Sequence, residues 1–141
     1  MPVGTTLGVC LALAGAPAQP PVFVPAQQFT LAWTHSIERV RWEEDYTIID
    51  GQEPRLQAGK ARIKGSAAGM EPPPEAVKRD GWYEYQPHQW PDTPLRLTRS
   101  GYTPDYDWCE QQTCQPMEDL LPTDGDITLL YPCRQDAQQR P

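Results

Sequence analysis

The stretch FTLAWTHSIERVRWEEDYTI, residues 29–48, contains two alternating patterns that are out of phase with each other. Apolar side chains first occupy odd positions, from Phe29 to Trp33, and later even positions, from Trp42 to Ile48. Alternation of this kind is typical of a half-buried strand. One displaced residue exchanges the two faces of a strand, so the change of phase predicts a bulge or tight turn between two strands.

The remainder of the chain has the composition of short strands joined by turns. Seventeen prolines and ten glycines are too many for long helices, while five tryptophans and six tyrosines supply aromatic side chains for a core. Further strands are expected at residues 55–64, 81–86, 95–99, 105–110, 113–117 and 126–131, with one helical turn at 117–121. The sequence therefore predicts an all-β fold, a small antiparallel sandwich or open barrel of about seven short strands.

The length and the net charge of the chain indicate the number of domains and exclude some kinds of partner. The 141 residues suit one domain with a modest core. The net charge is −7, and lysine and arginine form no cluster. Nucleic acid is therefore excluded as a partner, and an anionic membrane surface is disfavoured.

The first 28 residues have no charged side chain. The apolar run from Val3 to Ala16 is too short to span a bilayer, so stable membrane insertion is not expected, but it fits the apolar region of an export signal. The alternative is an apolar tail with no addressing role. We predict a signal peptide at 1–18, a Pro-rich linker at 19–28, a single β domain at 29–133 and a flexible tail at 134–141. The protein is then periplasmic or secreted after signal cleavage.

Cleavage would remove Cys10 and leave Cys109, Cys114 and Cys133 as disulfide candidates. Cys109 and Cys114 bracket four residues, a spacing compatible with a hairpin closed by a disulfide, and Cys133 could instead pair with either. The connectivity stays open. A lone C-x4-C with no histidine nearby has poor spacing for zinc, so no metal site is predicted.

His35 and Ser36 stand where the alternation breaks, and the bulge or turn is expected near residues 36–39. Adjacent residues of an extended strand point to opposite faces, so this pair is not predicted to form a nucleophilic dyad. Two interpretations remain for His35. It either pins the turn by hydrogen bonding, or it anchors a ligand in a small-molecule pocket.

The segment KGSAAGMEPPP, residues 64–74, is rich in glycine and proline. Backbone amides at Gly65, Ser66 and Gly69 could converge on an anion, with Lys64 or Arg62 as the cation beside them. Neither a Walker motif nor a G-x-G-x-x-G motif is present, so no nucleotide cofactor is predicted. The simpler interpretation is a flexible crossover that the prolines stiffen.

Two other features have structural rather than catalytic explanations. The aromatic side chains of residues 82–90 are expected to pack in the core and at its rim. Glu43 and Glu44 are neighbours on a strand and therefore diverge, which excludes the paired carboxylates of a glycosidase.

Several motifs together resemble the bacterial family named domain of unknown function 1850. They are WTHS at residues 33–36, GSAAGMEPP at 65–73, DGWYEY at 80–85 and LRLTRS at 95–100. Members of that family look like short exported proteins, often neighbours of TAXI-type TRAP transporters. The resemblance implies a periplasmic accessory role in solute uptake, with a TRAP transporter component as a partner.

These observations favour a non-enzymatic exported β domain that binds a small organic anion. The candidate ligand-binding residues are His35, Ser36, Lys64, Gly65, Ser66 and Gly69. One alternative is a small periplasmic hydrolase or isomerase with His35 as general base and Glu43 or Glu44 as its orienter. The other alternative is a structural module that contacts a partner protein through tryptophan and tyrosine side chains.

Overall fold

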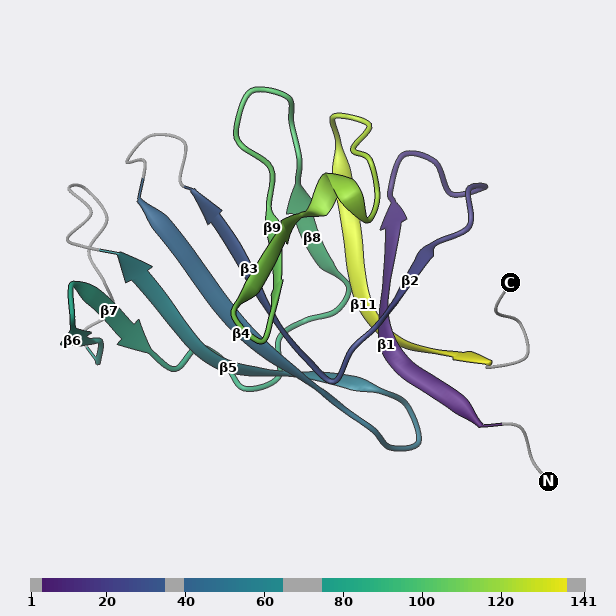
Figure 1. The fold of residues 1–141 in the computed structure, drawn as a ribbon. Helices are drawn as coiled ribbons and strands as arrows, with labels where there is room; N and C mark the ends of the chain where they lie inside the picture. Colours follow the sequence, from purple (N-terminus) through teal and green to yellow (C-terminus); the bar gives the residue numbers. More distant parts are fainter. Residues whose placement is uncertain (1–3, 35–39, 65–74, 137–141) are drawn as a thin grey trace.

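The computed structural model describes residues 4–34, 40–64 and 75–136 (Figure 1). These residues form the strands β1 (Thr5–Leu13), β2 (Val22–Pro25), β3 (Gln28–Thr34), β4 (Arg41–Ile49), β5 (Arg55–Lys64), β6 (Val77–Arg79), β7 (Trp82–Tyr85), β8 (Leu95–Thr98), β9 (Asp107–Glu110), β10 (Thr113–Pro116) and β11 (Ile127–Asp136). A single 3-10 turn, Met117–Asp119, follows β10 within the described residues.

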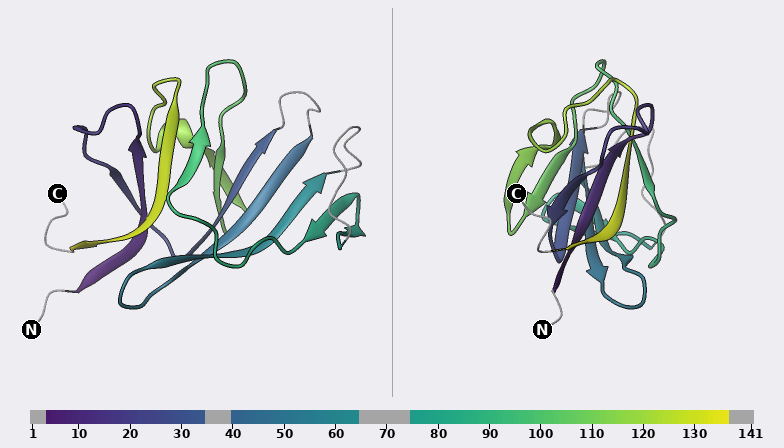
Figure 2. Two further views of the ribbon diagram at one scale, coloured as in Figure 1. Left: turned by 180° about the vertical axis from the view of Figure 1, so that it is seen from behind. Right: turned by 90° about the vertical axis from the view of Figure 1, so that its right-hand side faces the viewer.

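The strands form two antiparallel sheets. The four-stranded sheet has the order β2-β1-β11-β8, and the seven-stranded sheet has the order β10-β9-β3-β4-β5-β7-β6. Figures 1 and 2 show β6 and β7 at the end of the molecule farthest from β1 and β2. The prediction of an all-β antiparallel sandwich is therefore confirmed.

The core lies between the two sheets and contains the alternating residues of the 29–48 stretch. Phe29 stacks on Tyr46 with ring centroids 5.3 Å apart and on Trp108 at 4.4 Å. From the four-stranded sheet, Leu11 and Leu130 are fully buried against them. We call the core-facing side of the seven-stranded sheet its inner face and the opposite side its outer face.

The segment predicted as a signal peptide contains a central strand of the folded chain. β1 pairs with β2 on one side and with β11 on the other, and Val9 and Leu11 have no exposed surface. Cys10 forms a disulfide with Cys133 of β11. Cleavage near residue 18 stays a prediction, but it would take this strand and its disulfide out of the sheet. The predicted linker, 19–28, likewise contains β2.

A bulge in β5 shifts the buried positions of that strand. The register with β4 changes between Glu44 and Tyr46, where Gly59 and Lys60 provide one extra residue on β5. The buried side chains of β5 accordingly change from even to odd numbers along the strand. A Cβ atom at Gly59 would lie 3.2 Å from the Asp45 Cβ, so the close approach of the strands favours glycine there.

Strand number and chain ends differ from expectation. The sandwich has eleven described strands instead of about seven, because β1 and β2 lie in the predicted signal and linker, and β6 is a short exposed strand without alternation. β11 continues to Asp136, past residue 134 where the flexible tail was expected to begin. The bulge or turn expected at 36–39 lies outside the described residues.

Arg99 is a buried charge that connects β11 with the segment that precedes β9. Its guanidinium, 0% exposed, donates hydrogen bonds to both carboxylate oxygens of Asp105, at 2.9 and 2.8 Å, and to the Thr128 hydroxyl at 3.1 Å. Burial opposes ionisation of Asp105, but the hydrogen bonds from Arg99 hold the pKa of that carboxyl below its ordinary value.

Candidate functional site

The strands β3 and β5 end at the same end of the seven-stranded sheet. Both are antiparallel to β4, which lies between them, so they run in the same direction. Thr34, the last residue of β3, pairs with Arg41, and Ile63 near the end of β5 pairs with Trp42. The last residues of these two strands therefore lie at one end of the sheet, which we call the loop end.

Most predicted ligand-binding residues belong to the segments that follow β3 and β5 and lie outside the described residues. They are His35, Ser36, Gly65, Ser66 and Gly69. Lys64 is described and is the last residue of β5. Its ammonium group lies 5.2 Å from the centroid of the Trp82 ring, and in the described part of the chain no carboxylate lies within ion-pair distance of it. As far as the described residues go, Lys64 is therefore a cation at the loop end without an acidic partner.

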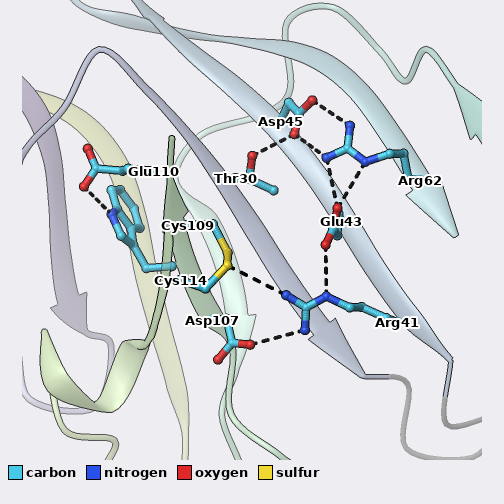
Figure 3. Close-up of a disulfide and its surroundings, with 10 residues drawn as sticks. Thr30, Arg41, Glu43, Asp45, Arg62, Asp107, Cys109, Glu110 and Cys114 are labelled. Atoms are coloured by element: carbon cyan, nitrogen blue, oxygen red, sulfur yellow. Dashed lines mark hydrogen bonds and ion pairs between the residues drawn. A yellow bond between two sulfur atoms is a disulfide. The ribbon is translucent and has the colours of Figure 1, made fainter. Parts of the chain in front are cut away.

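A ladder of charged side chains covers the outer face beside the loop end (Figure 3). Arg62 donates two hydrogen bonds of 2.8 Å to Asp45 and one of 3.1 Å to Glu43. Arg41 donates to the other oxygen of Glu43 at 2.9 Å, and the Thr30 hydroxyl donates to Asp45 at 2.7 Å. These groups hold one another in fixed positions across three strands.

The ion pairs of the ladder shift the pKa values of Asp45 and Arg62. Burial raises the pKa of Asp45, but the hydrogen bonds from Arg62 and Thr30 outweigh it and hold that pKa below its ordinary value. The hydrogen bond to Asp45 raises the pKa of Arg62 against the effect of burial. The bidentate pair is therefore ionised throughout the neutral pH range.

Glu44 lies on the inner face, away from this ladder. The Tyr46 hydroxyl donates to its carboxylate at 2.9 Å, and burial raises the pKa of Glu44. Glu43 and Glu44 thus occupy opposite faces, as expected, and do not act on one bond together. Glu43 is already held by two arginines, an arrangement that leaves it poorly suited to orient a histidine.

Aromatic rings cover the inner face near the loop end. The Trp33 ring lies 5.9 Å from that of Trp42 and 5.6 Å from that of Tyr106. In β7, Tyr83 pairs with the buried Ile63, whereas Trp82 lies on the outer face with Lys64. The aromatic side chains are thus divided between core packing and the support of a cation.

The hairpin formed by β9 and β10 closes the outer face on its other side. Cys109 and Cys114 lie directly opposite each other in this hairpin and form a disulfide. A guanidinium nitrogen of Arg41 lies 4.0 Å from the Cys114 sulfur, and another donates to Asp107 of β9 at 3.3 Å (Figure 3). Arg41 therefore joins the loop end of β4 to the hairpin.

From the sequence, Glu43 was considered only as an orienter of His35 or as one of a glycosidase pair, and the ion pairs of the ladder were not predicted. The alternation of Arg41, Glu43 and Asp45 at every second position signals a charged outer face of one strand. The partner Arg62 depends on the register after the β5 bulge, which the sequence does not specify. Within the described ranges, His, Cys, Asp and Glu side chains form no group of three that could hold a metal ion.

Comparisons with known proteins identify one family. The family model described as "Domain of unknown function (DUF1850)" matches residues 29–117, which is more than half of the chain. No curated protein and no solved structure matches the chain. Among the described residues no helix is long and apolar enough to cross a membrane.

Proposed function

The chain belongs to the DUF1850 family, and on that premise we propose that it is an exported, non-enzymatic domain that binds a small organic anion at the loop end of the seven-stranded sheet. The observation that carries this proposal is the parallel course of β3 and β5. It brings Thr34 and Lys64, the residues just before the two candidate segments, to one end of the sheet, although thirty positions separate them in the sequence.

Charge at the loop end supports an anionic ligand. Arg62 and Arg41 form ion pairs with the carboxylates of the ladder, whereas Lys64 rests on an aromatic ring and lacks a described acidic partner. An ammonium group at the end of a strand gains from contact with a carboxylate. The glycine-rich segment after Lys64 would add backbone amides.

Two disulfides indicate an oxidising compartment, since such bonds rarely persist in the cytosol. A periplasmic location and an accessory role beside a TRAP transporter component fit this observation. Both belong to the proposal, and both come from the resemblance of the chain to exported relatives.

A thermal-shift titration of the full chain with mono- and dicarboxylic acids tests the proposal. A ligand present at about 100 times its Kd stabilises the folded state by about 2.7 kcal/mol, which gives a clear rise in Tm. We expect at least one acid to raise the Tm, and we expect Lys64→Ala to weaken its binding about tenfold or more.

Lys60→Ala is the matched control, because Lys60 lies on the same strand with its ammonium 3.9 Å from Glu84. It should leave the affinity unchanged. Equal weakening by the two substitutions, or no response to any of the acids, would contradict an anion site at the loop end.

A further inference from the structure

The two disulfides occupy different kinds of position. Cys10–Cys133 joins β1 and β11, the two central strands of the four-stranded sheet, across a sequence separation of 123. Cys109–Cys114 joins β9 to β10, the edge strand of the seven-stranded sheet, across a separation of 5. The first lies inside a paired sheet, and the second closes a local hairpin at an edge.

The turn of this hairpin is held in an unfavourable backbone conformation. It consists of Gln111 and Gln112, with φ angles of 50° and 69°. Positive φ at both turn positions is the geometry of a tight hairpin turn, which normally selects asparagine and glycine. Glutamine has a Cβ atom that disfavours this region. The disulfide, one residue pair beyond the Glu110–Thr113 pair that flanks the turn, therefore clamps a turn that the sequence does not favour by itself.

The disulfide lies on the outer face and borders two hollows. Cys114 is exposed, whereas Cys109 is buried with 6% of its surface exposed. A hollow of about 310 Å³ is lined by both cysteines, and a larger one of about 680 Å³ is lined by Cys109. Arg62 and Thr30 line both hollows, so the approach to the disulfide is a polar surface of fixed shape.

The charged groups around the disulfide favour a cleavage in which Cys114, rather than Cys109, leaves as the thiolate. Arg41 faces the Cys114 sulfur at 4.0 Å, and Glu43 and Asp107 hold its guanidinium in place from two sides. Arg62 and Glu43 face the hollow on the Cys109 side. A negative charge that forms on the Cys114 sulfur is therefore stabilised by an adjacent, oriented cation.

We propose that Cys109–Cys114 is a thiol–disulfide exchange site for an external dithiol. A thiolate of the dithiol attacks the Cys109 sulfur from the hollow, the bond between the two cysteines breaks, and Cys114 leaves as a thiolate beside Arg41. The second thiolate of the dithiol then displaces Cys109. Two electrons pass to the hairpin, both cysteines take up protons, and the dithiol becomes a disulfide. The inference does not depend on the anion site.

Timed reduction of the folded full chain with dithiothreitol tests the exchange site. Free thiols are alkylated at each time, and peptide mapping reports each cysteine separately. We expect Cys109 and Cys114 to become alkylated at least ten times faster than Cys10 and Cys133. Equal rates, faster reduction of Cys10–Cys133, or reduction of the hairpin only as fast as the whole chain unfolds would each overturn the proposal.

A substitution of Arg41 tests the direction of cleavage. Loss of the guanidinium raises the pKa of the leaving thiol, and a thiol with a higher pKa leaves more slowly. Arg41→Gln should therefore slow reduction of the hairpin, and Arg41→Lys should restore part of the rate. The matched control is Arg134→Gln, because Arg134 follows Cys133 and pairs with Asp50 away from the hairpin. Equal rates for wild type and Arg41→Gln would refute the role of Arg41.

Discussion

Two variants, each with one disulfide replaced by a pair of serines, show how much each disulfide contributes to the free energy of unfolding. The chain-entropy relation gives about 5 kcal/mol for the Cys10–Cys133 bond, with its separation of 123 residues. It gives about 2 kcal/mol for Cys109–Cys114, with its separation of 5. Both variants exchange two sulfurs for two hydroxyls, so the difference, about 3 kcal/mol, comes from the loop lengths.

Urea unfolding followed by tryptophan fluorescence measures this difference. The double variant at positions 10 and 133 should unfold at a much lower urea concentration than the double variant at 109 and 114. Equal losses, or a larger loss for the hairpin variant, would refute the assignment of Cys10–Cys133 as the main covalent tie of the fold.

The same reasoning applies to the predicted cleavage near residue 18. A chain that begins at residue 19 lacks Val9 and Leu11, whose burial contributes about 1.5–3 kcal/mol each, as well as the disulfide partner of Cys133. The total loss is comparable with the whole stability of a small domain. We expect the shortened chain to lack a cooperative thermal transition in circular dichroism. A transition like that of the full chain would show that β1 is dispensable.

Two further substitutions test the packing and the buried charge. Gly8→Ala would place a Cβ atom 2.2 Å from the backbone oxygen of Val24. We therefore expect the free energy of unfolding in urea to fall by about 1–3 kcal/mol or more. An unchanged urea midpoint would contradict the close packing of β1 against β2. Asp105→Asn leaves the buried Arg99 without its main counter-charge and should cost roughly 3 kcal/mol at neutral pH. Because the pKa of Asp105 is lowered by folding, its contribution is full above the ordinary aspartate pKa and is lost as the pH falls through the lowered value. The stability difference between wild type and Asp105→Asn should therefore shrink in acid, and a difference that is constant with pH would argue against the ion pair.

The sequence predicted the sheet well where side chains alternate. Phe29 to Trp33 and Trp42 to Ile48 form β3 and β4, because one face of each strand is buried and the other carries polar groups. The N-terminal strand was not predicted. A run of small apolar residues without charge is typical of an export signal, and it is equally compatible with a strand between two others.

The parts of the candidate site that depend on pairing between distant strands could not be predicted from the sequence. From the sequence, His35 and the residues from Lys64 onward were grouped as candidates for one ligand site, and the order β3-β4-β5 brings the ends of their strands, Thr34 and Lys64, to one end of the sheet. The salt bridges of Arg62 depend on a bulge whose position no local pattern marks. The pairing of Cys10 with Cys133 depends on the neighbouring positions of β1 and β11, which only the folded sheet shows.

An NMR titration of the full chain with the most stabilising carboxylic acid tests the central claim most directly. An anion site at the loop end predicts that the amide resonances of Thr34, Arg41 and Lys64 shift together and saturate with one Kd, and that Lys64→Ala weakens this response. Shifts confined to other parts of the fold, with these three resonances unmoved at saturation, would contradict the proposed site.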